Sequence, residues 1–423
     1  MKRLLRDLDT SCPILILKAN RGVVHHGSVG VCRTLGRLGV SVYAIVDDGH
    51  APLANSRYIT KSFVWHRWPA TPDAFLRAVS AVAGVIGRPA VLFPMDDLSA
   101  ITVAENAKAL AKWFLLPRLP SHLPRQLANK AVCYSLCSRA GIPAPRSLIA
   151  MSIEDVLQFA EDSGLPIVLK AIDQWQLIAG RFSVKIIKNP KELSGFSNYF
   201  RDDFQPMLLQ EYIPGEDWIA HGYYNIDEHL LVTFTGKKLL AYPADAGSTA
   251  MGLSLNNETL RCQAEKFLKA IGYSGIIDMD WRKDERDGQY KMFDCNPRVG
   301  NNFRMFENTG AIDVVRSMYL DLTCQRIDRA PMIEGKLFIA ESFCSQSFFR
   351  GQQRRAMRPD ISIDRREFAW WSGDDIQPFM MMTVRLLHLT FLRAFRRARG
   401  FCSLVFHRLL PSAEGSARGT PAE

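Results

Sequence analysis

Residues 275–298 read Gly-Ile-Ile-Asp-Met-Asp-Trp-Arg-Lys-Asp-Glu-Arg-Asp-Gly-Gln-Tyr-Lys-Met-Phe-Asp-Cys-Asn-Pro-Arg. This stretch predicts two β-strands, Gly275 to Trp281 and Tyr290 to Asp294, because short apolar runs stand on either side of a polar segment. The polar segment 282–289 contains Asp-Gly, a dipeptide typical of hairpin connections. We therefore expect the two strands to pair with each other in one sheet.

Oxygen-bearing side chains fall on matching faces of these two strands. Asp278 and Asp280 share one face of the first strand, because side chains alternate along a strand. Asp294 and Asn296 share one face of the second strand in the same way. Pairing would bring Asp280 and Asp294 to one point, where oxygen ligands suit Mg²⁺, with Mn²⁺ as a substitute. The alternative is that these acids are only solvated, but their apolar neighbours would make an unpaired carboxylate costly.

The chain before this stretch opens with an α/β pattern. Three short apolar runs, 13–17, 40–46 and 90–95, have the composition of buried parallel strands. A glycine turn at 27–30 and helical spacing after it complete a βαβ unit between the first two runs. The turn lacks a full dinucleotide-binding glycine pattern, so we prefer a close strand-to-helix turn to a dehydrogenase-type site. We expect an open-sheet α/β domain at residues 1–122.

From residue 123 the strands and helices are gathered in blocks, which is typical of an α+β unit. We expect a two-lobed domain at 123–330, with lobes at about 123–205 and 206–330, which begins with a helix at 125–140. Residues 331–423 are expected to form a basic, largely helical C-terminal extension.

Two lysines and one acidic segment carry further polar chemistry in this domain. Lys130 lies near the start of a helix and Lys170 ends an apolar strand. Taken singly, either is expected to be a surface lysine with a buried stem. The segment 210–217 reads Gln-Glu-Tyr-Ile-Pro-Gly-Glu-Asp. Its first acid is expected at the end of a strand, and two further acids follow after a short linker. Such a linker offers backbone hydrogen bonds for adenine, and a carboxylate suits ribose hydroxyls.

Taken in order, these segments resemble the successive signatures of the ATP-grasp superfamily, most of all its carboxylate–amine ligase members. The resemblance is carried by the segments Asn129-Lys130, 141–145, 166–170, 210–215, 275–281 and 294–298. The first domain is similar to the pre-ATP-grasp domain of those proteins through residues 33–40 and 56–58. The similarity extends over roughly residues 10–325.

The resemblance implies an ATP-dependent ligase that activates a carboxylate as an acyl phosphate for attack by an amine. ATP and Mg²⁺ would be its cofactors, and a small-molecule carboxylate and amine its substrates. The implied nucleotide-binding residues are Lys130, Lys170, the adenine hinge Glu211, Tyr212 and Ile213 with Gln210 nearby, and Asp217 at the ribose. The implied magnesium ligands are Asp280, Asp294 and Asn296, and the implied catalytic residues are Arg298, which would face phosphate, and Lys238.

Two features depart from the family pattern. Asp280 and Asp294 stand where family members usually carry Glu, and Asp is one methylene shorter. The loop 171–181 holds one glycine, Gly180, where a phosphate-covering loop is commonly glycine-rich. An ATP-grasp phosphotransferase and a catalytically silent ATP-binding module therefore remain alternatives.

Several polar segments are candidates for the second substrate. Lys237-Lys238, Tyr242-Pro243 and 246–249 resemble the family's substrate-proximal loop, although an ordinary basic turn fits them equally well. Asp96-Asp97 follows a strand of the first domain, where ligands of open sheets bind. His25-His26 is expected to be structural or exposed.

Composition places limits on the class of protein. The chain has 423 residues, a net charge of +10 and nine scattered cysteines without a Cys-x-x-Cys pair, so we expect reduced core cysteines rather than zinc. No nucleic-acid-binding signature accompanies the positive charge, so no nucleic-acid partner is expected. The absence of a spanning run or signal segment predicts a cytoplasmic protein.

The basic segment 379–410 interleaves Arg with Phe, Leu and Met. This composition is typical of an interfacial helix, so peripheral contact with the inner face of a membrane is one expectation. A helix that packs on the protein itself or binds a partner is the alternative, and a homodimer is an assembly left open.

Overall fold

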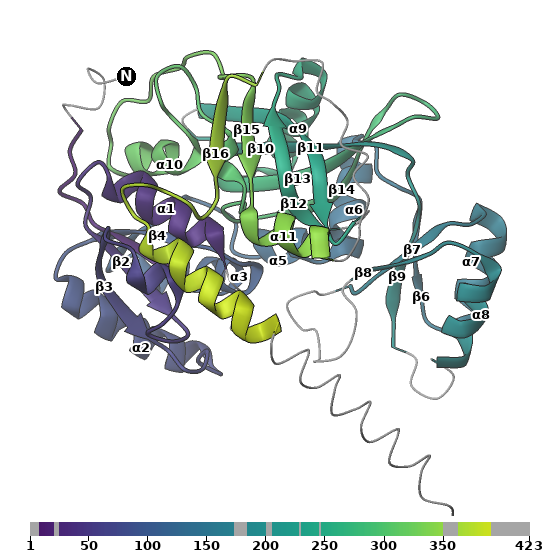
Figure 1. Cartoon of the computed structure of the whole chain (residues 1–423), viewed down its shortest axis with the longest axis horizontal. Coiled ribbons are helices and arrows are strands. Elements are labelled where there is room, and N and C mark those ends of the chain that lie inside the picture. Colours follow the sequence, from purple (N-terminus) through teal and green to yellow (C-terminus); the bar gives the residue numbers. More distant parts are fainter. Residues whose placement is uncertain are drawn as a thin grey trace, which may run out of the picture.

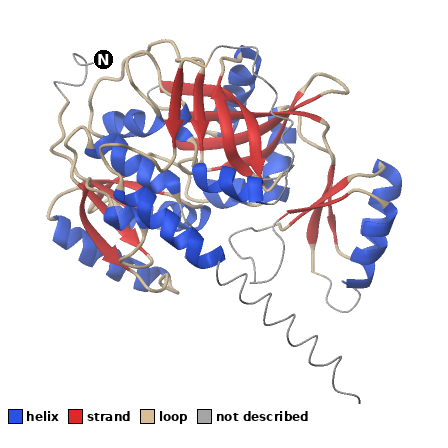
Figure 2. Ribbon diagram, in the orientation of Figure 1, coloured by secondary structure: helices blue, strands red, loops and turns tan. Residues whose placement is uncertain are grey.

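The computed structural model describes residues 8–20, 25–172, 184–199, 205–227, 230–244, 247–349 and 363–390. These residues form three sheets with helices around them, and Figure 1 and Figure 2 show the smallest sheet standing apart from the other two. None of the helices in the described ranges combines the length and the hydropathy needed to cross a bilayer.

The N-terminal domain is a parallel five-stranded sheet in the order β3-β2-β1-β4-β5. Its elements are β1 (Ile14–Leu17), α1 (His26–Gly36), β2 (Val42–Val46), η1 (Pro52–Asn55), β3 (Ile59–Val64), α2 (Pro72–Ile86), β4 (Ala90–Pro94), α3 (Asp97–Glu105), α4 (Ala107–Leu110) and β5 (Phe114–Leu115). The three expected strands are β1, β2 and β4, and they lie side by side in this sheet. Both of their faces are buried under helices, which explains their continuous apolar runs. The α/β open-sheet expectation is confirmed.

Two helices lead into the next domain, α5 (Leu123–Ala128) and α6 (Lys130–Ala140). The single helix expected at 125–140 is wrong in this respect, because Asn129 leaves helical geometry and caps α6 by accepting a hydrogen bond from Val132 N. The helix α6 ends at Gly141, whose positive φ of 62° suits glycine.

The small lobe is a four-stranded antiparallel sheet in the order β6-β9-β7-β8. It consists of β6 (Ser147–Ala150), α7 (Ile153–Ser163), β7 (Ile167–Lys170), β8 (Val184–Ile187), α8 (Pro190–Tyr199) and β9 (Met207–Glu211). Its core lies between the sheet and the two helices. Most of the expected phosphate-covering loop, including Gly180, lies outside the described residues.

The large lobe is a seven-stranded sheet in the order β14-β13-β10-β11-β12-β15-β16. It consists of β10 (Gly215–Asn225), β11 (Leu230–Tyr242), β12 (Ser248–Ser254), α9 (Glu258–Ile271), β13 (Gly275–Asp284), β14 (Tyr290–Asn296), η3 (Phe303–Met305), α10 (Val314–Leu322), β15 (Lys336–Ile339), α11 (Glu341–Phe349) and β16 (Arg365–Phe368). The expected hairpin of β13 and β14 is present, and β13 extends three residues beyond its expected end at Trp281.

The C-terminal stretch is not a separate extension, which corrects the expected boundary at residue 330. The strands β15 and β16 complete the sheet of the large lobe, where β15 pairs with β12 and β16 lies parallel to β15. After β16 the chain returns to the N-terminal domain and forms a helix at 377–390. Residues 391–423 lie outside the described residues, and so does most of the expected interfacial helix.

A buried ion pair fastens this returning segment to the N-terminal domain. Arg33 Nε on α1 lies 2.9 Å from Asp375 Oδ2, and both side chains are almost fully buried. Ser56 Oγ and Arg57 N also donate hydrogen bonds to the same carboxylate, at 2.7 and 2.9 Å. The neighbouring Asp374 pairs with Arg37 at 2.8 Å, but these side chains remain 41% and 33% exposed to water.

We predict that Asp375→Ala lowers the free energy of unfolding by about 3–5 kcal/mol, because it leaves the buried Arg33 guanidinium without its partner. Asp374→Ala is the matched control, and its loss should be about 1 kcal/mol or less, since exposed pairs are screened by water. Urea unfolding followed by circular dichroism measures both. Equal losses in the two variants would contradict the assignment.

Candidate active site

The residues predicted from the sequence to form a site line one cavity of about 320 Å³ between the two lobes and the N-terminal domain. Those that border it are Lys130, Lys170, Gln210, Glu211, Tyr212, Ile213, Asp217, Lys238, Asp280, Asp294, Asn296 and Arg298. Segments far apart in the chain therefore meet at one place. The individual role of each residue stays a prediction.

The floor of the cavity is the paired strands β13 and β14. Asp280 lies directly opposite Asp294 in the register, and Asp278 lies opposite Asn296. All four side chains border the cavity, as the alternation of residues along each strand predicts. Met279 and Cys295, which alternate with them, are buried in the hydrophobic core on the other face.

Each of these carboxylates faces a cation from another element. Lys130, the first residue of α6, pairs with Asp294, and Lys238 Nζ on β11 lies 3.0 Å from Asp280 Oδ1. Burial opposes ionisation of Asp294, but the Lys130 ammonium outweighs it and lowers the pKa of this carboxyl. At Asp280 burial prevails over the Lys238 ammonium, and its pKa is raised. The two facing carboxylates are thus held in different electrostatic environments.

Arg298 joins the floor of the cavity to the N-terminal domain. Its Nη1 donates to Asp278 Oδ2 at 2.9 Å, and its Nε lies 3.5 Å from Asp97 Oδ1 at the start of α3. Asp278 also lies 2.6 Å from His221 Nε2. Burial raises the pKa of Asp97, although the Arg298 guanidinium opposes that shift. The arginine is therefore fixed from two sides and faces the cavity with a defined orientation.

The oxygen-bearing side chains at the cavity floor fit a magnesium ion only if a bound substrate supplies further oxygen ligands. Within the described ranges no group of three or more His, Cys, Asp or Glu side chains is arranged to hold a metal ion by itself. Asp280, Asp294 and Asn296 offer two carboxylates and an amide oxygen at the cavity floor. Mg²⁺ is typically bound by one or two carboxylates plus the phosphates of a substrate, which this set allows.

Lys170, the last residue of β7, has a different environment from the other cavity lysines. No carboxylate of the described residues lies within ion-pair distance of its Nζ, which contacts Phe293 O at 3.3 Å and Tyr134 Oη at 3.4 Å. Burial, together with the nearby Lys130 charge, lowers the pKa of Lys170 to about 8. Its ammonium is therefore available to an anionic ligand in the cavity.

The hinge segment lies where β9 ends. Gln210 is buried and donates to Tyr134 Oη at 2.6 Å, so its side chain supports the wall of the cavity. The Glu211 carboxylate accepts from Arg146 N at 2.9 Å and pairs with Arg286. These contacts fix the course of the chain through Tyr212 and engage the Glu211 carboxylate, so the predicted adenine contact of Glu211 would come from its backbone.

Arg282 is a residue of the cavity that the sequence interpretation missed. It pairs with Asp217 at 2.6 Å and donates to Ile213 O at 2.9 Å, so it ties the expected ribose-binding acid to the hinge. The sequence pattern places Arg282 in the polar hairpin connection 282–289. Because β13 continues past it, the alternation of Asp278, Asp280 and Arg282 could have identified it.

The segments expected near the second substrate divide between the cavity and its surroundings. Tyr242, Pro243, Gly247, Ser248 and Thr249 border the cavity, whereas Ala246 lies outside the described residues. Lys237 pairs with Glu216 instead and does not border the cavity.

Of the acidic pair at the end of β4, only Asp97 borders the cavity. Asp96 caps α3 and accepts hydrogen bonds from Ala19 N and Asn20 N, which fixes the loop after β1. His25 caps α1, and His26 is buried among three aromatic rings. The structural interpretation of the two histidines is thus confirmed.

Comparison with known proteins agrees with this architecture. No protein family profile matches the chain. Over 307 residues it is 24% identical to the D-aspartate ligase of Enterococcus faecium, which amounts to 69% of this chain and 72% of that protein.

Two solved structures illustrate the similarity of the fold. The L-amino acid ligase from Bacillus licheniformis has a TM-score of 0.56 at 16% identity, over 74% of this chain and 75% of that one. The biotin carboxylase domain of the Hydrogenobacter thermophilus 2-oxoglutarate carboxylase, in complex with MgADP, ADP and bicarbonate, has a TM-score of 0.54 at 19% identity, over 75% and 71%. The fold expected from the sequence segments is therefore confirmed.

We predict that the affinity for ATP falls as the pH rises above about 8, because Lys170 is then neutral in the free protein and binding of the polyphosphate must take up a proton. Below that pH the affinity should be nearly constant. Calorimetry in buffers of different ionisation enthalpy measures the proton uptake.

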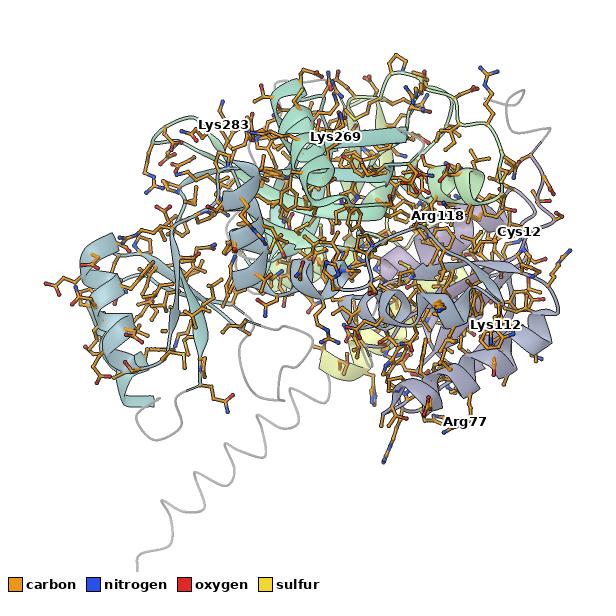
Figure 3. All side chains as sticks on the ribbon, turned by 180° about the vertical axis from the view of Figure 1, so that it is seen from behind. Cys12, Arg77, Lys112, Arg118, Lys269 and Lys283 are labelled. Carbon is orange, nitrogen blue, oxygen red and sulfur yellow. The ribbon has the colours of Figure 1, made fainter. Side chains whose placement is uncertain are left out.

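Lys170→Met should weaken ATP binding about 10- to 100-fold near pH 7 and abolish the proton uptake, since a hydrogen bond to a charged group is lost. Lys283→Met is the control, because Lys283 is exposed on β13 and is labelled in Figure 3. Unchanged affinity in Lys170→Met would contradict the phosphate-binding role.

Proposed function

We propose that this ATP-grasp protein is an ATP-dependent ligase that joins the carboxylate of an amino acid to an amine. The observation that carries the proposal is the register of β13 and β14, which sets Asp280 opposite Asp294 at the floor of a cavity lined by five cationic side chains. The similarity to D-aspartate ligase supports the choice of an amino acid as the carboxylate.

The first step transfers a phosphoryl group. A carboxylate oxygen of the substrate attacks the γ-phosphorus of ATP, the bond to the β-phosphate oxygen breaks, and ADP leaves. Lys130 and Lys170 would bind the phosphates, while Arg298 would stabilise the charge that develops on the transferred group. Magnesium, held by Asp280, Asp294 and Asn296, would neutralise phosphate charge when bound.

The second step forms the C–N bond. The neutral amine attacks the carbonyl carbon of the acyl phosphate, inorganic phosphate leaves, and the amine loses one proton. Lys238, held by Asp280 at 3.0 Å, would stabilise negative charge on the carbonyl side of this cavity. Its pKa is raised, because the carboxylates of Asp280 and Asp217 outweigh burial, so it remains a cation throughout.

The deciding experiment measures ADP release with purified protein, Mg²⁺ and ATP against a panel of D- and L-amino acids, with and without added amines. We expect one amino acid to support ADP release in the presence of an amine, with a product mass equal to the two substrates minus water. ADP release with a phosphorylated product and no need for an amine would favour a phosphotransferase. No turnover with measurable ATP binding would favour a silent binding module.

A variant pair tests the metal assignment. Asp294→Asn and Asn296→Ala should each lower kcat about a hundredfold or more, because electrostatic stabilisation of the phosphoryl group is lost. Asp287→Asn, an exposed acid of the same hairpin, should retain the rate of the unsubstituted protein. Thermal unfolding of the three variants shows whether each is folded. Normal rates and an unchanged Mg²⁺ requirement in both site variants would disprove the assignment.

A further inference from the structure

Asp97 differs from the other acidic side chains that border the cavity. Each of the others lies at 3.0 Å or less from a cationic side chain, and these acids are Glu211, Asp217, Asp278, Asp280 and Asp294. Asp97 Oδ1 lies 3.5 Å from Arg298 Nε, and it is buried without a hydrogen-bond donor among the described residues. A buried carboxylate oxygen that is paired so weakly destabilises the free protein.

A second acceptor without a donor lies on the same side of the cavity. Asn301, three residues after Arg298, borders the cavity, and its Oδ1 is buried with no hydrogen-bond donor in the described ranges. Asn301 also lies against the N-terminal domain, because a Cβ atom added at Gly27 of α1 would be 2.8 Å from Asn301 Oδ1. Asp97 belongs to that domain as the first residue of α3. Both acceptors therefore lie where the cavity meets the N-terminal domain.

The chemistry of these two acceptors limits the kind of group that could bind them. The charge of Asp97 disfavours an anion. One carboxylate and one amide oxygen are few ligands for a divalent metal ion, and no group of three or more metal-ligating side chains occurs in the described part of the chain. A protonated amino group supplies up to three N–H donors and a positive charge, and its hydrogen bonds to a carboxylate are strong because both partners are charged.

We propose that Asp97, together with the Asn301 amide, binds the protonated amino group of a substrate. This assignment rests on the proposed function, in which both the amine and the amino acid carry such a group. Arg298, the residue expected to face the transferred phosphoryl group, is the neighbour of Asp97, so the bound amino group lies close to the acyl phosphate. Asp97 is thus the anionic counterpart of Lys170, since each is a charged group of the cavity that a substrate would complete.

The first test measures binding and needs no turnover. The thermal unfolding midpoint of the full-length protein is compared in about 0.2 M ammonium chloride, tetramethylammonium chloride and potassium chloride. Tetramethylammonium has the charge of ammonium but no N–H donor, and potassium is a cation of similar size. We expect ammonium to raise the midpoint by about 1–2 °C more than either of the other two cations.

Variants connect this difference to the two acceptors. Asp97→Asn keeps the shape of the side chain, removes its charge and should abolish the difference, whereas Asn301→Leu should reduce it. Asp73→Asn is the matched control, because Asp73 also lies in the first turn of a helix of the N-terminal domain but is exposed and does not border the cavity. The midpoint without added salt shows whether each variant is folded.

The salt comparison can overturn the proposal in two ways. Equal midpoints in ammonium and tetramethylammonium would show that no N–H donor is bound. Equal rises in ammonium and potassium, both lost in Asp97→Asn, would replace the amino-group site by a site for a monovalent metal ion.

Steady-state kinetics then distinguishes the two substrates as the source of the amino group. Hydroxylamine, which is largely uncharged at neutral pH, replaces the amine, attacks the acyl phosphate and releases phosphate and a hydroxamate. If Asp97 binds the amino acid, Asp97→Asn should raise the KM for the amino acid at least about tenfold in this assay, since a charged hydrogen bond is lost. If Asp97 binds the amine, hydroxamate formation should be unchanged and the KM for the amine should rise by that factor.

In both cases the KM for ATP should stay the same. A fall in kcat with every KM unchanged would show that Asp97 acts only by positioning Arg298, and it would overturn the proposal. An unsubstituted protein that turns over no amino acid would contradict the proposed function, whereas the role of Asp97 in binding an amino group would still be decided by the salt comparison.

Discussion

The direct opposition of Asp280 and Asp294 across β13 and β14 is the constraint around which the centre of the molecule is built. Two carboxylates in a partly buried cavity destabilise a fold unless cations lie beside them. The nearest cations come from different parts of the chain, Lys130 from α6 and Lys238 from β11. The packing of α6 and the position of β11 in the large sheet thus have to satisfy the charges of one hairpin.

The same arrangement accounts for the chemistry that we propose. Lys130, which neutralises Asp294 in the free protein, is expected to face phosphate in the complex, and Lys238, which neutralises Asp280, is expected to face the carbonyl side of the acyl phosphate. Binding of magnesium and nucleotide would exchange one set of ion pairs for another, so the cavity need not bury an uncompensated charge at either stage. Lys170, which has no carboxylate of the described residues at ion-pair distance, is the position where the nucleotide would supply a missing partner.

The local sequence pattern was sufficient to predict the hairpin of β13 and β14, because strand alternation places Asp278 and Asp280 on one face without knowledge of the rest of the chain. It was sufficient for β1, β2 and β4, whose continuous apolar runs indicate burial on both faces. It failed for β3, since an edge strand with largely accessible side chains needs no apolar run. The pairing of β15 with β16 could not be predicted from the sequence either, because β16 is short, carries two arginines and is defined only by contact with a distant strand.

The ion pair between Arg33 and Asp375 joins residues that are 342 positions apart. While the protein is being synthesised, Arg33 on α1 has no such partner until residue 375 has left the ribosome. The N-terminal domain, although it is made first, therefore cannot reach its final packing as an independent unit ahead of the rest. Asp375, near the end of the described chain, completes the packing of the N-terminal domain. The order in which this molecule becomes stable therefore differs from the order in which it is translated.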